Sequence, residues 1–235
     1  MVLFGTIING VCIILGSIIG LFLTKIKEKY KETIVQGIGL TVILIGLQMA
    51  LQVESIIIVL ISMLVGTLIG EFLRLEDMVN RFGNWIGSRF VTNKNGVNIS
   101  QAFVTASLLF VVGAMAILGA LDSGLRGDHE ILLTKAVLDG FSAFVLTTTL
   151  GIGVILSVIP VVLFQGTIAL LATQIEGIIP EPIFNNLLID ITAVGGLLIF
   201  AIGLNLLKII QIRVTNLLPA LIIVGVLTYM IGTIN

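Results

Sequence analysis

The chain has 235 residues, of which 57% are hydrophobic and 11% are charged, and its formal net charge is −1. Soluble domains carry about 25% charged residues, so this composition excludes an ordinary water-soluble fold and predicts an integral membrane protein. The near-zero charge gives no reason to expect nucleic acid as a partner. One cysteine and one histidine cannot supply a zinc site, and we expect no cofactor or metal.

Long apolar segments follow one another along the chain, each close to the roughly 20 residues that cross a bilayer as a helix. Because backbone polar groups need internal partners in lipid, the segments predict an all-α membrane protein. Eight spans are predicted, at 2–24, 33–52, 55–73, 102–121, 131–151, 154–175, 184–207 and 215–233. Only TTTLGIGV (147–154) divides the fifth from the sixth, so a seven-span version with one broken or re-entrant segment stays open.

The distribution of charge favours eight spans. With that number, ten of the twelve basic residues fall on one side of the membrane, and most acidic loops fall on the other. The positive-inside rule makes the basic side cytoplasmic, so both termini are predicted to lie outside. The ten are Lys25, Lys27, Lys29, Lys31, Arg74, Arg81, Arg89, Lys94, Lys208 and Arg213.

Residues 75–90, LEDMVNRFGNWIGSRF, have a different pattern from the spans. Apolar residues recur there at helical spacing with acidic and basic residues between them, which predicts an amphipathic helix on the cytoplasmic interface. Trp85 would anchor this helix. A solvated linker helix is the alternative.

An internal repeat links the two ends of the chain. GLTVILIGLQM (39–49) matches GLLIFAIGLNL (196–206), and FGTIINGVCIILG (4–16) matches PVVLFQGTIALLA (160–172) more weakly. Spans two and seven cross in opposite directions under the eight-span topology, so the repeats are predicted to be inverted. Inverted repeats are typical of secondary transporters, whose sites lie near the bilayer midplane. Shared composition of apolar helices is the alternative explanation.

The repeat gives a domain plan with a single transmembrane domain, 1–235. Repeat one covers 1–73, and the interfacial helix and its loop cover 74–100. Two central helices occupy 101–152, and repeat two covers 153–235. The predicted architecture is therefore a 3+2+3 arrangement of helices.

Three ionisable residues within the predicted spans are candidates for a site: Lys135, Asp139 and Asp190. Such residues are costly in a bilayer and usually face a cavity or a partner. Asp139 is the strongest candidate ligand for a cation, proton or solute, but Lys135 stands one helical turn before it and can pair with it. Both interpretations stay open. Asp190 lies near the start of its span and is a weaker candidate.

Amides add neutral hydrogen-bonding groups to the spans. Asn9 and Gln165 each precede a glycine and correspond in the repeat, and Gln48 corresponds to Asn205. They are candidates for a solute pathway, or else they join helices by hydrogen bonds. The chain lacks a G-x-S-x-G elbow, a P-loop and an H-E-x-x-H motif, so we do not expect an enzyme.

Four stretches carry a resemblance to a known family: GTIINGVCIILGSIIGLFL (5–23), SLLFVVGAMAILGALDSGLRGD (107–128), KAVLDGFSAF (135–144) and IRVTNLLPAL (212–221). They resemble the uncharacterised bacterial polytopic membrane-protein family that includes YqgA and YdfK. The resemblance covers nearly the whole chain and implies a location in the bacterial cytoplasmic (inner) membrane. It supplies no substrate and no site residue.

From these observations we expect a secondary transporter or facilitator of a small solute or ion. The alternative is a non-transporting membrane regulator or scaffold that uses the Gly16/Gly20 and Gly66/Gly70 faces for close packing. The expected partners are the lipid bilayer and an unidentified solute or ion, and spare glycine faces would also allow a homodimer.

Overall fold

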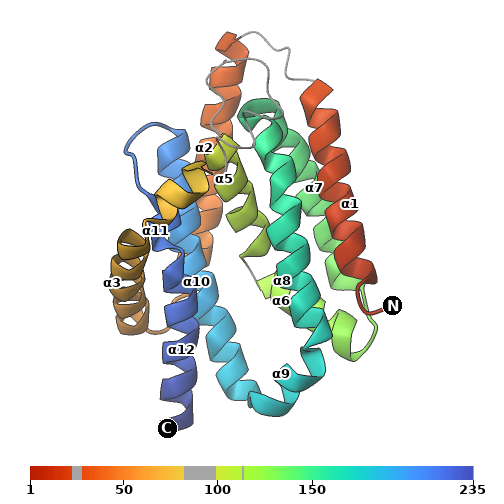
Figure 1. Ribbon diagram of the computed structural model, residues 1–235, viewed down its shortest axis with the longest axis vertical. Coiled ribbons are helices and arrows are strands. Elements are labelled where there is room, and N and C mark those ends of the chain that lie inside the picture. Colours follow the sequence, from red (N-terminus) through yellow and green to blue (C-terminus); the bar gives the residue numbers. More distant parts are fainter. Residues whose placement is uncertain (23–27, 82–98, 113, 235) are drawn as a thin grey trace. The chain divides into compact units, whose positions relative to one another are not determined.

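The computed structural model describes residues 1–22, 28–81, 99–112 and 114–234, and within them the chain is helical with turns and no strand (Figure 1). The contacts group the chain into two compact units. The first unit comprises Met1–Ile34, Arg81–Val111 and Met115–Ile178, and the second comprises Val35–Asn80, Val112–Ala114 and Ile179–Asn235.

Helices α1, α5 to α9 and the 3-10 helix η1 supply the first unit, and α2, α3 and α10 to α12 supply most of the second. Their bounds are α1 Phe4–Phe22, α2 Glu28–Ala50, α3 Ile56–Leu73, α5 Ile99–Val111, α6 Ala114–Leu125, α7 Glu130–Leu150, η1 Ile152–Ser157, α8 Val158–Leu170, α9 Ala172–Ile178, α10 Glu181–Leu206, α11 Val214–Leu217 and α12 Pro219–Ile234.

The described residues contain seven helices long and apolar enough to cross a membrane, or eight if one bent pair counts as a span. This confirms an all-helical architecture over the described residues, with several segments that are able to span a membrane. The bent pair is the predicted fourth span, which is two helices, Ile99–Val111 and Met115–Leu125, at an angle of 57°. Gly113 stands between them in the sequence and lies outside the described residues.

The boundary between the fifth and sixth spans is a sharp turn at one glycine. Helix α7 ends at Leu150, and Gly151 follows with φ 79° and ψ −160°. A residue with a Cβ rarely adopts that conformation, so the glycine ends α7 and starts η1. Residues 147–154 therefore form a helix end and a turn.

The predicted amphipathic helix is described only in its first part. Residues 75–81 are helical, directly after Arg74, which has φ 52° and ends α3. The rest of the predicted segment, 82–90 with Trp85, lies outside the described residues. The interfacial position of this segment stays a prediction.

Close contact between α1 and α7 organises the first unit (Figure 1). Gly5 of α1 packs against Leu132 of α7, and Gly16 and Gly20 pack farther along, against the backbone of Gly140 and Phe144. Since the contacts advance in the same direction on both helices, α1 and α7 run parallel. Helix α8 runs antiparallel to α1: Gly10 meets Val162, whereas Leu3, nearer the start of α1, meets Gly166, farther along α8.

Antiparallel contacts between backbones organise the second unit. Gly66 and Gly70 of α3 pack against Ala220 and Asn216, at and just before the start of α12. Helices α2 and α10 meet through two glycine pairs, Gly39 with Gly203 and Gly46 with Gly196.

The glycine faces at Gly16/Gly20 and Gly66/Gly70 are therefore occupied by other helices of the same chain. The homodimer stays a prediction, and these faces do not support it.

The glycine contacts generate a prediction for two positions of α2. A Cβ at Gly46 would lie 2.7 Å from Phe200 Cα and 2.8 Å from Gly196 O, whereas a Cβ at Gly37 would meet no atom within 4 Å. We expect Gly46→Ala to lower the free energy of unfolding by ~1–3 kcal/mol through overpacking. Gly37→Ala, the matched control, should raise it by ~0.5–1 kcal/mol. Thermal unfolding in detergent measures both, and equal effects of the two substitutions would contradict the α2–α10 contact.

Candidate functional site

A cluster of four polar side chains lies buried in the first unit: Asn9 of α1, Lys135 and Asp139 of α7, and Gln165 of α8. Lys135 Nζ lies 2.9 Å from Asp139 Oδ1, and Asn9 Nδ2 donates to Asp139 Oδ2 at 3.0 Å. Asn9 and Gln165 are fully buried, and the side chains of Lys135 and Asp139 are only 9% and 7% exposed. We call these four residues the polar cluster.

The local sequence explains why the cluster forms. Lys135 and Asp139 are four residues apart, so they lie on one face of α7. Gly140 follows directly, and a Cβ there would stand only 3.0 Å from Cys12 O. The glycine therefore allows α1 to approach α7 closely enough for Asn9 to reach the carboxylate.

Hydrogen bonds fix the orientation of both amides in the cluster. The Asp139 carboxylate can only accept, so Asn9 must present its NH₂ group there. That group also donates to Gln165 Oε1 at 3.3 Å. Asn9 Oδ1 and Gln165 Nε2 are then left buried without a hydrogen-bond partner among the described residues. Each buried atom without a partner lowers the stability of the fold. Asn9 Oδ1 could accept one further hydrogen bond, and Gln165 Nε2 could donate one.

The charges of the cluster cancel each other. Asp139 has a cation and an amide donor in place, so it is a paired carboxylate and not a free ligand for a cation. Burying an ion pair of this kind is tolerated only with good geometry and further hydrogen bonds, and the cluster provides both. Of the two interpretations of Asp139, a free ligand or a partner of Lys135, the geometry agrees with the second, since the lysine pairs with the carboxylate.

The remaining predicted site residues lie in the second unit. Gln48 is exposed on α2. Asn205 donates to Ile212 O and accepts from Ile212 N, both at 2.8 Å, so it closes the turn that follows α10. Although the sequence repeat pairs these two amides, neither joins the polar cluster, which the structure builds from Asn9, Lys135, Asp139 and Gln165.

Asp190 lines a cavity of about 240 Å³ in the second unit. Asp190 is 4% exposed, and its Oδ2 accepts a hydrogen bond of 2.7 Å from Thr228 Oγ1. Glu54, just before α3, lines the same cavity and is exposed, so it stands at the rim. The wall further includes Ser55, Ile58, Pro182, Ile183, Asn186, Ile231 and Gly232.

Glu54 and Thr228 line the cavity but are not among the site residues predicted from the sequence. Glu54 belongs to one of the acidic loops, and Thr228 is an ordinary residue of an apolar span. The topology contained a usable signal, because the starts of spans three and seven and the end of span eight all fall on the acidic side of the membrane.

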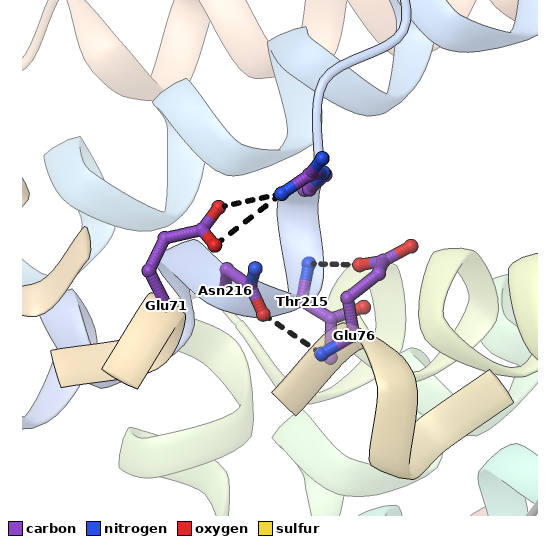
Figure 2. A network of polar contacts seen from close by, with 5 residues as sticks. Glu71, Glu76, Thr215 and Asn216 are labelled. Atoms are coloured by element: carbon purple, nitrogen blue, oxygen red, sulfur yellow. Dashed lines mark hydrogen bonds and ion pairs between the residues drawn. The ribbon is translucent and has the colours of Figure 1, made fainter. Parts of the chain in front are cut away.

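At the far end of α3 from the cavity, a polar network joins this helix to the segment before α12 (Figure 2). Glu76 N donates to Asn216 Oδ1 at 2.7 Å, and Thr215 N donates to Glu76 Oε2 at 3.2 Å. Arg213 Nη1 lies 3.3 Å from each oxygen of Glu71. We call these five residues the α3–α11 clasp.

The chain has extensive similarity to bacterial proteins. A family model described as "Protein of unknown function (DUF554)" matches residues 4–229. The chain belongs to the DUF554 family. It is 35% identical to the "Uncharacterized membrane protein YdfK" of Bacillus subtilis (strain 168) over 234 residues, 97% of each chain. It is 30% identical to the "Uncharacterized protein YqgA" of Escherichia coli (strain K12) over 223 residues, 93% of each chain.

No solved structure matches the chain. The family match confirms the resemblance seen in the sequence, and the relative's name agrees with the apolar helices. This DUF554 chain is therefore a membrane protein of an uncharacterised family.

The polar cluster generates a prediction about stability. Lys135→Met leaves the Asp139 carboxylate buried without its cation, which typically costs ~3–5 kcal/mol. The double variant Lys135→Met/Asp139→Asn removes both charges and should recover part of that loss. Thermal unfolding in detergent measures the stability of the unchanged protein, the single variant and the double variant.

Arg126 and Asp122 provide the matched control, because they are also four residues apart but have exposed fractions of 75% and 28%. Arg126→Met should cost at most ~1 kcal/mol. If Lys135→Met were no more harmful than Arg126→Met, the buried ion pair would not be a feature of the folded protein.

Proposed function

We propose that this DUF554 protein is a secondary transporter or facilitator that moves a small solute or ion across the cytoplasmic membrane. The observation that carries the proposal is the cavity that Asp190 lines. Its wall combines Glu54, Ser55 and Ile58 from the first predicted repeat with residues of α10 and α12 from the second. Sites between repeats are typical of secondary transporters.

The packing of the helices supports the inverted repeat. Each predicted repeat contributes three long segments, and corresponding segments pack antiparallel: α1 with α8, α2 with α10, and α3 with α12. Gly39 corresponds to Gly196, and Gly46 to Gly203, so the two glycine contacts between α2 and α10 exchange with each other under a two-fold rotation. Asn9 and Gln165 also correspond, and they meet directly.

The direction of α7 supports eight spans. Helices α1 and α7 are parallel, so α7 begins on the side of the membrane where α1 also begins. Between them the chain must cross an odd number of times. Helices α2 and α3 account for two crossings, and the bent pair α5–α6 supplies the third. An even total then places both termini on one side, which the basic loops predict to be the outside.

The two ends of the α3–α12 pair differ, as alternating access requires. At the end predicted to be cytoplasmic, the α3–α11 clasp holds the helices together. At the end predicted to be outside, the cavity separates Glu54 from Asp190. We infer an outward-facing conformation, in which opening the clasp would expose the cavity to the other side.

The second candidate function is a non-transporting regulator or scaffold, and the polar cluster favours it. A lysine that satisfies Asp139 in the protein interior is the arrangement of a packed, structural bundle. The two functions differ in one measurable respect, since only the transporter requires solute movement through the cavity at Asp190. Neither assigns the chain a catalytic reaction.

A flux measurement tests the transporter. Proteoliposomes that contain the protein should exchange a panel of small ions and amines faster than protein-free vesicles do. Asp190→Asn should lower the rate at least about tenfold, because a group at the binding site acts through charge and hydrogen bonds of ~1.5–3 kcal/mol. Asn9→Ala and Asp139→Asn should lower it only as far as they lower stability.

Glu181→Gln is the matched control, since Glu181 begins α10 but lies outside the cavity wall that the structure describes. Flux that persists in Asp190→Asn would exclude this cavity as the path. Vesicles with no exchange for any member of the panel would favour the regulator or scaffold.

The α3–α11 clasp provides a separate test of alternating access. Cysteines at Glu71 and Arg213, in a chain with Cys12→Ala, would be joined by a bifunctional thiol reagent with a reducible link. Cross-linking should stop flux, and reduction should restore it, because the helices must part for the cavity to face the other side. Each single-cysteine protein serves as the control. Unchanged flux in the cross-linked protein would show that this end does not open.

A further inference from the structure

Asp190 is a buried carboxylate that no cation balances within the described part of the chain. The residue is 4% exposed, and its described side-chain hydrogen bond comes from the neutral hydroxyl of Thr228. None of the three ion pairs among the described residues includes it. A carboxylate that the fold shields to this degree is costly unless charges or further hydrogen bonds compensate it, so the site favours a positive partner.

Asp139, the buried carboxylate of the polar cluster, differs from Asp190 because a lysine of its own helix pairs with it. Asp139 has Lys135 four residues before it on the same helix, at 2.9 Å. At Asp190 the corresponding position is Asn186, an exposed amide on the cavity wall. The same helical geometry is therefore available at Asp190, but the sequence places no cation there.

The wall of the cavity narrows the chemistry of the partner. Besides Asp190 and Glu54, the wall contributes the polar groups of Ser55, Asn186 and Thr228, and no Lys, Arg or His among the described residues lines it. An anion would meet two carboxylates, so the site selects against it. Glu54 at the rim adds negative charge that attracts cations toward the opening.

A bare metal ion is poorly matched to this wall. Hard divalent cations take six or more oxygen ligands, and the described residues contain no group of three His, Cys, Asp or Glu side chains that could hold one. Ile58, Ile183 and Ile231 give the cavity an apolar side. That surface suits an alkyl body, and the carboxylate suits a donor with N–H groups and a positive charge.

We propose that the cavity binds a small organic cation, a protonated amine with a short alkyl body, whose ammonium group pairs with the Asp190 carboxylate. Thr228 Oγ1 donates to one carboxylate oxygen and leaves the remaining lone pairs for the ammonium. The volume of about 240 Å³ is below the roughly 300–1,000 Å³ of sites for drug-sized ligands, so the alkyl body is short. The inference rests on the proposed function only in that it names the solute class for the same cavity.

Binding to purified protein in detergent tests the inference. Isothermal titration at neutral pH would compare n-butylammonium chloride with 1-butanol, which has a similar alkyl body and no charge, and with sodium butyrate. We expect n-butylammonium to bind and the alcohol and the carboxylate to bind at least about tenfold more weakly, because a charge-assisted hydrogen bond contributes ~1.5–3 kcal/mol. Asp190→Asn should weaken n-butylammonium by a similar factor, since its amide keeps an acceptor for Thr228 but loses the charge.

Two further variants complete the experiment. Glu181→Gln removes the same charge from the start of α10, outside the described cavity wall, and should leave n-butylammonium binding unchanged. Ile231→Trp, at a partly exposed wall position, should fill the cavity and abolish binding without a change of charge. This variant keeps the proposal testable if Asp190→Asn does not fold.

The outcomes separate this inference from the proposed function. Equal affinity for n-butylammonium and 1-butanol, or equal loss in Asp190→Asn and Glu181→Gln, would overturn the amine site. Flux of another solute could still persist in that case, and the transporter would stand. Charge-selective binding without flux in proteoliposomes would sustain the amine site and overturn the transporter.

Discussion

Removing a carboxylate from water costs free energy unless a positive charge or hydrogen bonds compensate the lost hydration. The buried carboxylates of Asp139 and Asp190 differ in how that cost is met. At Asp139 the compensation is internal, because Lys135 and Asn9 reach the two oxygens. At Asp190 the described residues supply one hydroxyl and an open cavity. In a medium where each uncompensated charge is costly, that difference is the reason why we propose a ligand for Asp190 and none for Asp139.

Close approach of backbones makes both arrangements possible. Asn9 reaches Asp139 because glycines bring α1 and α7 together, and Gly66 and Gly70 likewise bring α3 against the segment that leads into α12, whose later residues line the cavity. The hydrophobic effect gives helices in lipid little reason to associate, so the packing of small residues and interhelical hydrogen bonds must hold them together. The glycines thus set which polar groups can meet, although none of them is itself a binding residue.

Much of this organisation could be predicted from the sequence, because hydropathy and charge report on the bilayer directly. The spans and the turn at Gly151 left signals in the order of residues, and the repeat proposed from the sequence drew attention to Asn9 and Gln165, which are in contact in the structure. The pairing of Asp139 with Lys135 could be posed but not decided, since the spacing allows both a salt bridge and a lysine that extends to the interface. Thr228 and the contact of Glu76 with Asn216 depend on tertiary packing between distant segments. The bend between α5 and α6 lies inside one apolar stretch, so hydropathy alone does not predict it.

The parallel packing of α1 and α7 has a consequence for how the protein is made. Helix α1 ends at Phe22 and its main partner begins at Glu130, so during synthesis α1 is inserted long before α7 exists. Asn9 therefore enters the bilayer without its carboxylate, and the apolar remainder of α1 must retain it there. The polar cluster can therefore form only late in synthesis, after α7 and α8 have been made and inserted. A protein truncated before α7 would keep Asn9 in its first helix without the carboxylate that it contacts in the complete fold.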